Sequence, residues 1–274
     1  MKNIYGYTEI IEDLLLLKEK YEDKLYIGSM GTSCQGRIIP ILRAGRGRKK
    51  LLVVASVHGR EHITSAFLMR SVKELMECGD FPEDKSLFVV PVLNPDGVEI
   101  SLGREVYFEV PADFRAELFK NNARNVNLNA NFPYLFSKVP QSRQGGEGPA
   151  SELETKALVN LCEKESFASA IALHARGNCI FWRDFGNGEV KGDFKLARSL
   201  SKACGFDLVS PTRNASDYSG GFENWFRCRF RRPALCVELV KDEEISFTDM
   251  YPNFEKAVLW DKTQDFLGAY LKFS

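Results

Sequence analysis

The stretch LLVVASVHGREHITSAF, residues 51–67, joins an apolar run to a polar corner and then to the start of a second patterned segment. Residues 51–57 are almost continuously apolar, which is typical of a strand covered on both faces. Residues 62–77 have the pattern of a helix. Between them, His58, Glu61 and His62 lie within five residues. The sequence therefore predicts a strand-to-helix corner whose side chains could bind a metal ion or transfer protons.

The same alternation of buried strands and helices continues along the chain. We expect further strands at 37–42, 87–93, 168–174 and 233–240, and helices at 8–22, 151–165 and 254–272. Ser151 and Glu154 have the spacing of a capping box at the start of their helix. Because helices alternate with buried strands, the predicted fold class is α/β with a mainly parallel sheet.

Two long segments have the composition of loops. Residues 94–124 begin with the turn signal NPDG, and residues 133–150, PYLFSKVPQSRQGGEGPA, are rich in Pro, Gly and Ser. Both are longer than plain connectors, and long loops on α/β scaffolds often carry binding sites. We therefore expect part of any functional site to come from these loops.

The composition excludes several classes of protein. The 274 residues include 37 basic and 37 acidic side chains, so no polybasic surface for nucleic acid or membrane is indicated. No apolar run reaches the length of a membrane span, and the N-terminus lacks the pattern of a secretory signal. Seven scattered cysteines without a CxxC pair indicate reduced thiols. The expected location is the cytoplasm, and nothing indicates an oligomeric state.

The chain has only three histidines, and two of them end buried-strand patterns. His58 and His174 should lie at the same edge of the sheet, because open α/β sheets gather ligands at the carboxyl ends of their strands. With Glu61 they make a plausible three-ligand zinc site that leaves a position open for water. A charged helix N-terminus at Glu61 and a structural His174 are the competing interpretations. For His62 we expect a structural or supporting role.

Glu238 is the one acid within the apolar run PALCVELV, residues 233–240. A carboxylate in a buried strand is costly unless it is paired or functional. An ion pair with an arginine would explain it. The functional interpretation is a general base beside a metal-activated water.

Six motifs in order carry a family resemblance: VHGREHIT, NPDG, NARNVNLNANFP, GGEGPASELETKAL, LHARGNCIFW and GGFENWFRCRFRRPALCVEL. The chain resembles the zinc carboxypeptidase family of carboxypeptidase A type (M14). It is most similar to the bacterial branch that includes γ-D-glutamyl-L-diamino acid endopeptidases. The resemblance implies one catalytic domain over residues 1–274. It also implies a three-layer α/β/α fold with a mixed, mostly parallel central sheet.

Residue by residue, the resemblance implies roles for positions that match the family motifs. His58, Glu61 and His174 match the ligands of one Zn²⁺, and Glu238 matches the general base. Arg124 matches the arginine that polarises the scissile carbonyl. Two further matches concern substrate binding: Asn129, for the terminal carboxylate, and Tyr218, for a mobile capping tyrosine.

Ala130 departs from the family pattern, which has arginine at this position. The family arginine grips the substrate's C-terminal carboxylate, and alanine cannot replace a bidentate contact. Another cation could take over, with Arg176 the preferred candidate and Arg213 the second. Alternatively, the enzyme could act without requiring a free C-terminus, or turnover could be lost.

The expected function is zinc-dependent hydrolysis of a peptide or amide bond near a C-terminus. The sub-family resemblance indicates a bacterial cell-wall peptide of the γ-D-glutamyl-diaminopimelate type as substrate. Two alternatives stay open at this stage. One is a catalytically silent zinc protein that binds peptides, and the other is an amidase or deacylase for a non-peptide substrate.

Overall fold

An eight-stranded mixed sheet forms the centre of the protein in the computed structural model, which describes residues 4–106, 109–110, 112–184, 186, 188–241 and 245–273. The strand order is β1-β2-β4-β3-β5-β8-β6-β7. Four pairings are parallel and three are antiparallel, as predicted for a mixed, mostly parallel sheet. The strands are β1 Leu25–Thr32, β2 Ile38–Ala44, β3 Lys49–Val54, β4 Lys85–Val90, β5 Ser169–Ala175, β6 Cys179–Phe181, β7 Asp207–Val209 and β8 Ala234–Leu239.

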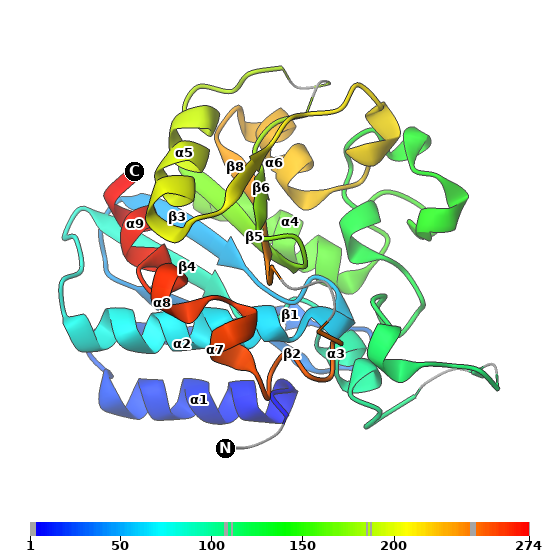
Figure 1. Cartoon of the computed structure of the whole chain (residues 1–274), viewed down its shortest axis with the longest axis horizontal. Coiled ribbons are helices and arrows are strands. Elements are labelled where there is room, and N and C mark those ends of the chain that lie inside the picture. The colour runs from blue at the N-terminus through cyan, green and yellow to red at the C-terminus, as the bar shows by residue number, and fades with distance from the viewer. Residues whose placement is uncertain are drawn as a thin grey trace.

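Helices pack on both faces of this sheet (Figure 1). They are α1 Tyr7–Lys20, α2 Ile63–Cys78, α3 Pro95–Ser101, α4 Leu153–Glu165, α5 Asp193–Cys204, α6 Phe222–Phe230, α7 Phe254–Ala257, α8 Trp260–Thr263 and α9 Phe266–Phe273. Short 3₁₀ helices include η1 Gly59–Glu61, η2 Ala116–Leu118, η3 Leu128–Ala130, η4 Phe136–Lys138, η5 Gln141–Arg143 and η6 Ala215–Asp217. In the described residues, no helix is both long and apolar enough to cross a membrane.

Two hydrophobic cores confirm the three-layer prediction. Because side chains alternate along a strand, Leu51 and Val53 of β3 join the core with α1, α2, α5 and the C-terminal helices. Leu52 and Val54 point the other way, into the core with α4 and α6. Both faces are covered, which explains why the central strands are almost continuously apolar.

Two local predictions are wrong. The C-terminal segment 254–272 is three short helices rather than one, and Leu259, with a left-handed φ of 52°, separates the first helix from the second. The capping box at Ser151 does not form either. Glu152 is the N-cap residue of α4, and Ser151 Oγ donates to the Glu152 carboxylate instead. The Glu154 carboxylate is buried, where it accepts a hydrogen bond from the backbone N–H of Cys34.

Several elements escape the pattern-based prediction. β6 and β7 have three residues each, too few for a periodicity to be visible. α3 and η2 lie within the segment predicted as a loop at 94–124, of which residues 107–108 and 111 lie outside the described part. β1, α5 and α6 were also not predicted. These elements are stabilised by their tertiary packing more than by local sequence.

His62 lies beneath the N-terminus of α2 and is 4% exposed. Its Nδ1 atom is enclosed and has no hydrogen-bond partner among the described residues. Burial, with the nearby Arg104 charge, lowers the pKa of His62 to about 4. The side chain is therefore a neutral packing group, consistent with the structural role expected from the sequence.

We expect the free energy of unfolding to fall as the pH drops from about 6.5 to about 4, because the unfolded chain binds a proton at His62 that the folded chain excludes. The difference between the two pKa values corresponds to about 3 kcal/mol. Urea unfolding at a series of pH values should show this slope, and it should be reduced in the His62→Gln variant. An unchanged slope in the variant would contradict the assignment.

Candidate metal centre

The corner after β3 is held in place by three hydroxyl groups. The chain turns at Ser56, whose φ is 44° and whose backbone N–H donates to Thr64 Oγ1 at 2.8 Å. Thr64 Oγ1 in turn donates to the carbonyl oxygen of Glu61 at 2.8 Å, and the Oγ atoms of Ser56 and Ser65 lie 2.6 Å apart. The first turn of α2 therefore fixes the loop that carries His58 and Glu61.

Two glycines let α3 approach this loop closely. A Cβ atom on Gly59 would lie 2.2 Å from the carbonyl oxygen of Gly97, in the NPDG motif. A Cβ atom on Gly97 would lie 2.4 Å from the Asn121 carbonyl oxygen. Asn94 caps α3 by accepting a hydrogen bond from the Gly97 N–H at 2.9 Å. The NPDG turn is thus a support for the metal-ligand loop, and the sequence alone did not reveal this role.

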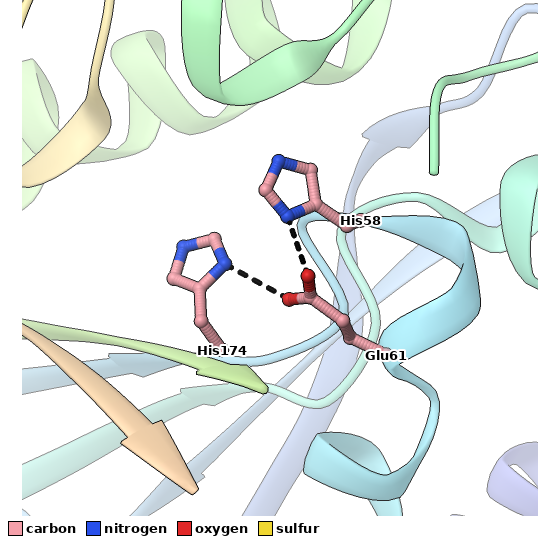
Figure 2. A group of neighbouring side chains, drawn as sticks. All are labelled: His58, Glu61 and His174. Carbon is pink, nitrogen blue, oxygen red and sulfur yellow. Dashed lines mark hydrogen bonds and ion pairs between the residues drawn. The ribbon is translucent and has the colours of Figure 1, made fainter. Parts of the chain in front are cut away.

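The structure brings His58, Glu61 and His174 together as the sequence analysis predicted. Glu61 Oε1 lies 2.8 Å from His58 Nδ1, and Glu61 Oε2 lies 3.0 Å from His174 Nδ1. One ligand atom from each side chain falls within 4.8 Å of the others. Figure 2 shows the Glu61 carboxylate between the two imidazole rings, with a dashed line to each. All three side chains are buried.

The tautomer of His58 leaves Nδ1 free for a cation. Asn127 Oδ1 accepts a hydrogen bond from the backbone N–H of Asn129 at 3.0 Å, which identifies it as the oxygen of the amide. His58 Nε2, 3.0 Å from the same oxygen, must therefore carry a proton and donate it. In the neutral ring the Nδ1 lone pair then faces the Glu61 carboxylate, so a proton or a metal ion is needed between them.

Burial and the contacts within the triad shift the pKa values of its three side chains. Burial alone would raise the pKa of Glu61, but the adjacent imidazoles hold that pKa well below its usual range. Burial opposes charging of His174, yet its contact with Glu61 raises the pKa of His174 to about 9. Burial lowers the pKa of His58. A carboxylate that stays ionised between two nitrogen donors is a donor set that suits Zn²⁺.

Glu238 lies directly beside His174. The two residues are paired across β5 and β8, and neighbouring side chains at paired positions project to the same face of a sheet. Glu238 Oε2 is enclosed without a hydrogen-bond partner among the described residues. Burial raises the pKa of Glu238 to about 8, against the opposing effect of His174. This orphan carboxyl oxygen beside the triad is where a reacting water or a cation would find a partner.

Arg124 and Lys120, two of the cations in this part of the structure, differ in what they contact. Arg124 pairs with Glu147 at 3.5 Å and Glu152 at 3.8 Å, and its side chain is 49% exposed. Neither acid belongs to the triad. Lys120 was not singled out by the sequence analysis, but its backbone carbonyl accepts the Gly59 N–H at 2.9 Å. Burial lowers the pKa of the Lys120 ammonium group, whereas the nearby charges of Glu61 and Glu238 act in the opposite direction.

Asn129 and Tyr218 line one cavity of about 310 Å³. Asn129 Nδ2 lies 3.5 Å from His174 Nε2, while its Oδ1 accepts the Phe222 N–H at 2.9 Å. Tyr218 is buried, and its hydroxyl donates to the Thr212 carbonyl oxygen at 3.1 Å. The cavity therefore begins at Asn129, beside the triad.

Arg176 and Arg213 were considered as replacements for the arginine missing at position 130. The Arg176 guanidinium donates to the Ile245 carbonyl at 3.0 Å and packs over Phe247. Arg213 is exposed. A third arginine, Arg143, donates to the Asn129 carbonyl at 2.8 Å and also to the carbonyls of Ser216 and Ser219. The sequence analysis did not select it, because nothing in the local pattern connects it with Asn129.

A mixed sheet with a His–Glu–His cluster and an adjacent carboxyl at one edge suits a metal-dependent hydrolase. Residues 10–244 match the zinc carboxypeptidase family, Peptidase M14, and the chain belongs to this family. The resemblance identified from the motifs is thereby confirmed. The fold and the site therefore place the chain in a family of zinc-dependent peptidases.

Individual relatives agree with this assignment. Gamma-D-glutamyl-L-diamino acid endopeptidase 1 of Lysinibacillus sphaericus is 27% identical over 264 residues, covering 86% of this chain and 65% of the relative. Bovine thrombin-activatable fibrinolysis inhibitor has the same fold, with a TM-score of 0.80 at 16% identity over 98% and 96% of the two chains. Murein-tripeptide amidase MpaA from Escherichia coli O157 has a TM-score of 0.56 at 21% identity over 85% and 90%.

We expect the purified protein to bind one Zn²⁺ per chain and to lose tight binding in the His174→Ala variant. At a free zinc concentration of 100 times Kd, binding should add about 2.7 kcal/mol to the free energy of unfolding. Metal analysis after dialysis and thermal unfolding with and without zinc measure both effects. His62→Gln is the matched control and should retain the metal. Retention of zinc by His174→Ala would exclude the triad as the binding site.

Proposed function

We propose that the protein hydrolyses a peptide or amide bond, with His58, Glu61 and His174 as ligands of one Zn²⁺ and Glu238 as the general base. One observation carries this proposal. The paired register of His174 and Glu238 sets an unpartnered carboxyl oxygen beside a cluster of three metal-binding side chains. Structural ion pairs do not leave a buried carboxylate oxygen without a partner.

For the substrate we propose a bacterial cell-wall peptide, cut next to a diamino acid. The proposal is supported by the names of two proteins similar to this chain, an endopeptidase for γ-D-glutamyl-L-diamino acid bonds and a murein-tripeptide amidase. This chain spans 65% of the endopeptidase's length, so the activity of that whole protein does not transfer automatically. The residues of the site supply the hydrolytic chemistry, whereas the relatives suggest the substrate.

Zn²⁺ held by the triad would supply Lewis-acid chemistry, polarising a carbonyl and making water more acidic. Glu238 would accept a proton from the attacking water at Oε2 and pass it to the nitrogen of the leaving amine. Its raised pKa, about 8, suits a group that must both take and return a proton near neutral pH. The Asn127 contact would keep the His58 ring fixed in the tautomer that presents Nδ1.

Lys120 rather than Arg124 is our proposed partner for the oxyanion that develops during attack. The backbone carbonyl of Lys120 accepts a hydrogen bond from the loop that carries His58, and the charges of Glu61 and Glu238 act on its ammonium group. The guanidinium of Arg124 is engaged by Glu147 and Glu152. A cation placed where negative charge develops contributes most when water is largely excluded.

Because position 130 is alanine, the main question of specificity is whether the substrate must have a free C-terminus. The side chain is fully buried, so no flexible group at this position reaches substrate. Arg143 lies against the carbonyl of the neighbouring Asn129 and is a better-placed cation than Arg176 or Arg213. Backbone carbonyls occupy part of the Arg143 donors, which leaves fewer of them for a substrate carboxylate. We therefore propose that the enzyme acts as an endopeptidase or amidase and does not strictly require a terminal carboxylate.

Zinc-loaded protein should cleave L-Ala-γ-D-Glu-diaminopimelate peptides, and the Glu238→Gln variant should lower kcat by about 10²–10⁴-fold, because the general base is lost. Mass spectrometry of the products after incubation with muropeptides and ordinary L-peptides measures both. Zinc content should be equal in the two proteins, which separates the loss of a base from the loss of the metal.

The same panel should include peptides with free and with amidated C-termini. Equal cleavage of both would support action without a terminal carboxylate, and cleavage of free ends alone would assign that contact to a cation such as Arg143. If zinc binds at one per chain and no peptide is cleaved, the hydrolytic proposal fails and a peptide-binding role replaces it.

Replacement of Lys120 by Met should reduce kcat/KM by about 10²–10³-fold, whereas Arg124→Met should change it by less than about threefold. Steady-state kinetics on the best substrate of the panel compares the two variants. Lys120→Arg should recover part of the rate, because the positive charge is restored. The opposite ranking of Lys120→Met and Arg124→Met would return the role to Arg124.

A further inference from the structure

Arg143, at the end of η5, is a partly buried cation whose hydrogen bonds all go to backbone carbonyls. Its Nη2 atom donates to the Asn129 carbonyl at 2.8 Å, and Nη1 donates to those of Ser216 at 3.0 Å and Ser219 at 2.9 Å. Within the described residues, no carboxylate forms an ion pair with its guanidinium. Burial lowers the pKa of Arg143. Such a charge is costly to hold without an anionic partner, so its three contacts call for an explanation.

The three carbonyls belong to two separate segments that meet at one cavity. Asn129 lies in η3, whereas Ser216 and Ser219 belong to the loop of residues 214–219, which contains η6. Tyr218 of this loop and Asn129 both line the cavity of about 310 Å³ beside the triad. One guanidinium therefore joins two walls of the cavity.

The backbone next to this loop packs closely against position 130. Gly220 has a φ of 70°, and a Cβ atom on it would lie 2.3 Å from the carbonyl oxygen of Ala130. The Phe132 N–H donates to the Gly220 carbonyl at 3.0 Å. The position at which the family pattern has arginine is thus part of a backbone contact, and the arginine that holds the neighbouring Asn129 comes from a different loop.

Asn129 is held at both its side chain and its backbone. Its Oδ1 atom accepts the Phe222 N–H at 2.9 Å, which identifies Nδ2 as the atom that lies 3.5 Å from His174 Nε2. Arg143 holds the carbonyl of the same residue. The amide nitrogen of Asn129 is thereby kept next to the triad, where a bound substrate would meet it. A small displacement of a substrate-binding group can weaken its contact strongly.

We propose that Arg143 is a positioning residue, which holds Asn129 and the loop of residues 214–219 at the separation that substrate binding requires. This inference rests on the proposed hydrolytic function, because it gives Arg143 a part in substrate binding at that site. Arg143 acts through Asn129. A planar guanidinium suits this role, since its donors point in fixed directions toward separate carbonyls.

Kinetics with the peptide L-Ala-γ-D-Glu-diaminopimelate tests the role of Arg143. In Arg143→Met, KM should rise by about 10–100-fold while kcat stays within about threefold, because substrate binding is weakened and the hydrolytic groups are unchanged. Arg143→Lys should recover part of the loss, and zinc should remain at one per chain. Lys138→Met is the matched control, since it removes an exposed cation from the same long loop, and its KM should be that of the wild type.

Two results would overturn the inference at this stage. One is a fall in kcat as large as the rise in KM, or a loss of zinc, which would make Arg143 a general structural residue. The other concerns the double variant with Asn129→Ala. If Arg143 acts through Asn129, adding Arg143→Met to Asn129→Ala should raise KM by less than about twofold, because coupled residues are not additive. A full further increase would contradict the inference.

Hydrogen exchange measures the positioning without any substrate. In zinc-loaded Arg143→Met, two amides should exchange at least about tenfold faster: that of Phe222, bonded to Asn129 Oδ1, and that of Tyr218, bonded to the Ala215 carbonyl. Amides of β5 should keep the wild-type rate, which shows that the variant folds. Unchanged exchange at Phe222 and Tyr218 would contradict the inference, even if the protein proves to be a hydrolase.

Binding separates this inference from the proposed function. Calorimetry in the zinc-loaded Glu238→Gln background measures affinity for the same peptide without turnover. A Kd that rises on adding Arg143→Met, and not on adding Lys138→Met, supports the positioning role even if the wild type does not cleave this peptide. Faster exchange at both amides with an unchanged Kd would reduce the contacts of Arg143 to a structural role and overturn the inference.

Discussion

The carboxylate of Glu61 is the interaction on which the site depends. It is buried between the Nδ1 atoms of His58 and His174, and it also accepts the Ala175 N–H at 3.3 Å. One side chain thereby ties the corner after β3 to the end of β5, more than a hundred residues later. A buried charge must be compensated, so both histidines are held against this carboxylate, in a cluster that could bind a metal ion.

The sheet determines how this centre becomes reactive. β5 and β8 are parallel neighbours, and their register pairs His174 with Glu238. A shift of one residue in this register would turn Glu238 to the opposite face, into the core with α2 and α5. The apolar packing of Leu235 and Val237 on that face fixes the register. Core packing is thus the reason that a carboxyl with an unpartnered oxygen lies beside the triad.

Loops and short helices complete the site around this rigid edge. Lys120, Asn127 and Asn129 come from one segment. The Lys120 carbonyl accepts the N–H of Gly59 in the metal-ligand loop, and the Asn129 side-chain oxygen accepts the N–H of Phe222 in α6. Glu223 comes from the start of α6 and leaves a second carboxyl oxygen without a partner. The unpartnered oxygen of Glu238 lies where the proposed reaction would supply the missing group.

The sequence by itself determined the α/β class, the family, and the side chains of the triad with Glu238. Buried strands are recognisable as apolar runs, and rare residue types at their ends stand out against them. Only the tertiary structure placed Lys120 beside the metal-ligand loop and Arg143 against Asn129, and gave Arg124 its contacts with Glu147 and Glu152. These residues lie in segments without periodicity, and their surroundings are made by contacts between distant parts of the chain, which local patterns do not encode.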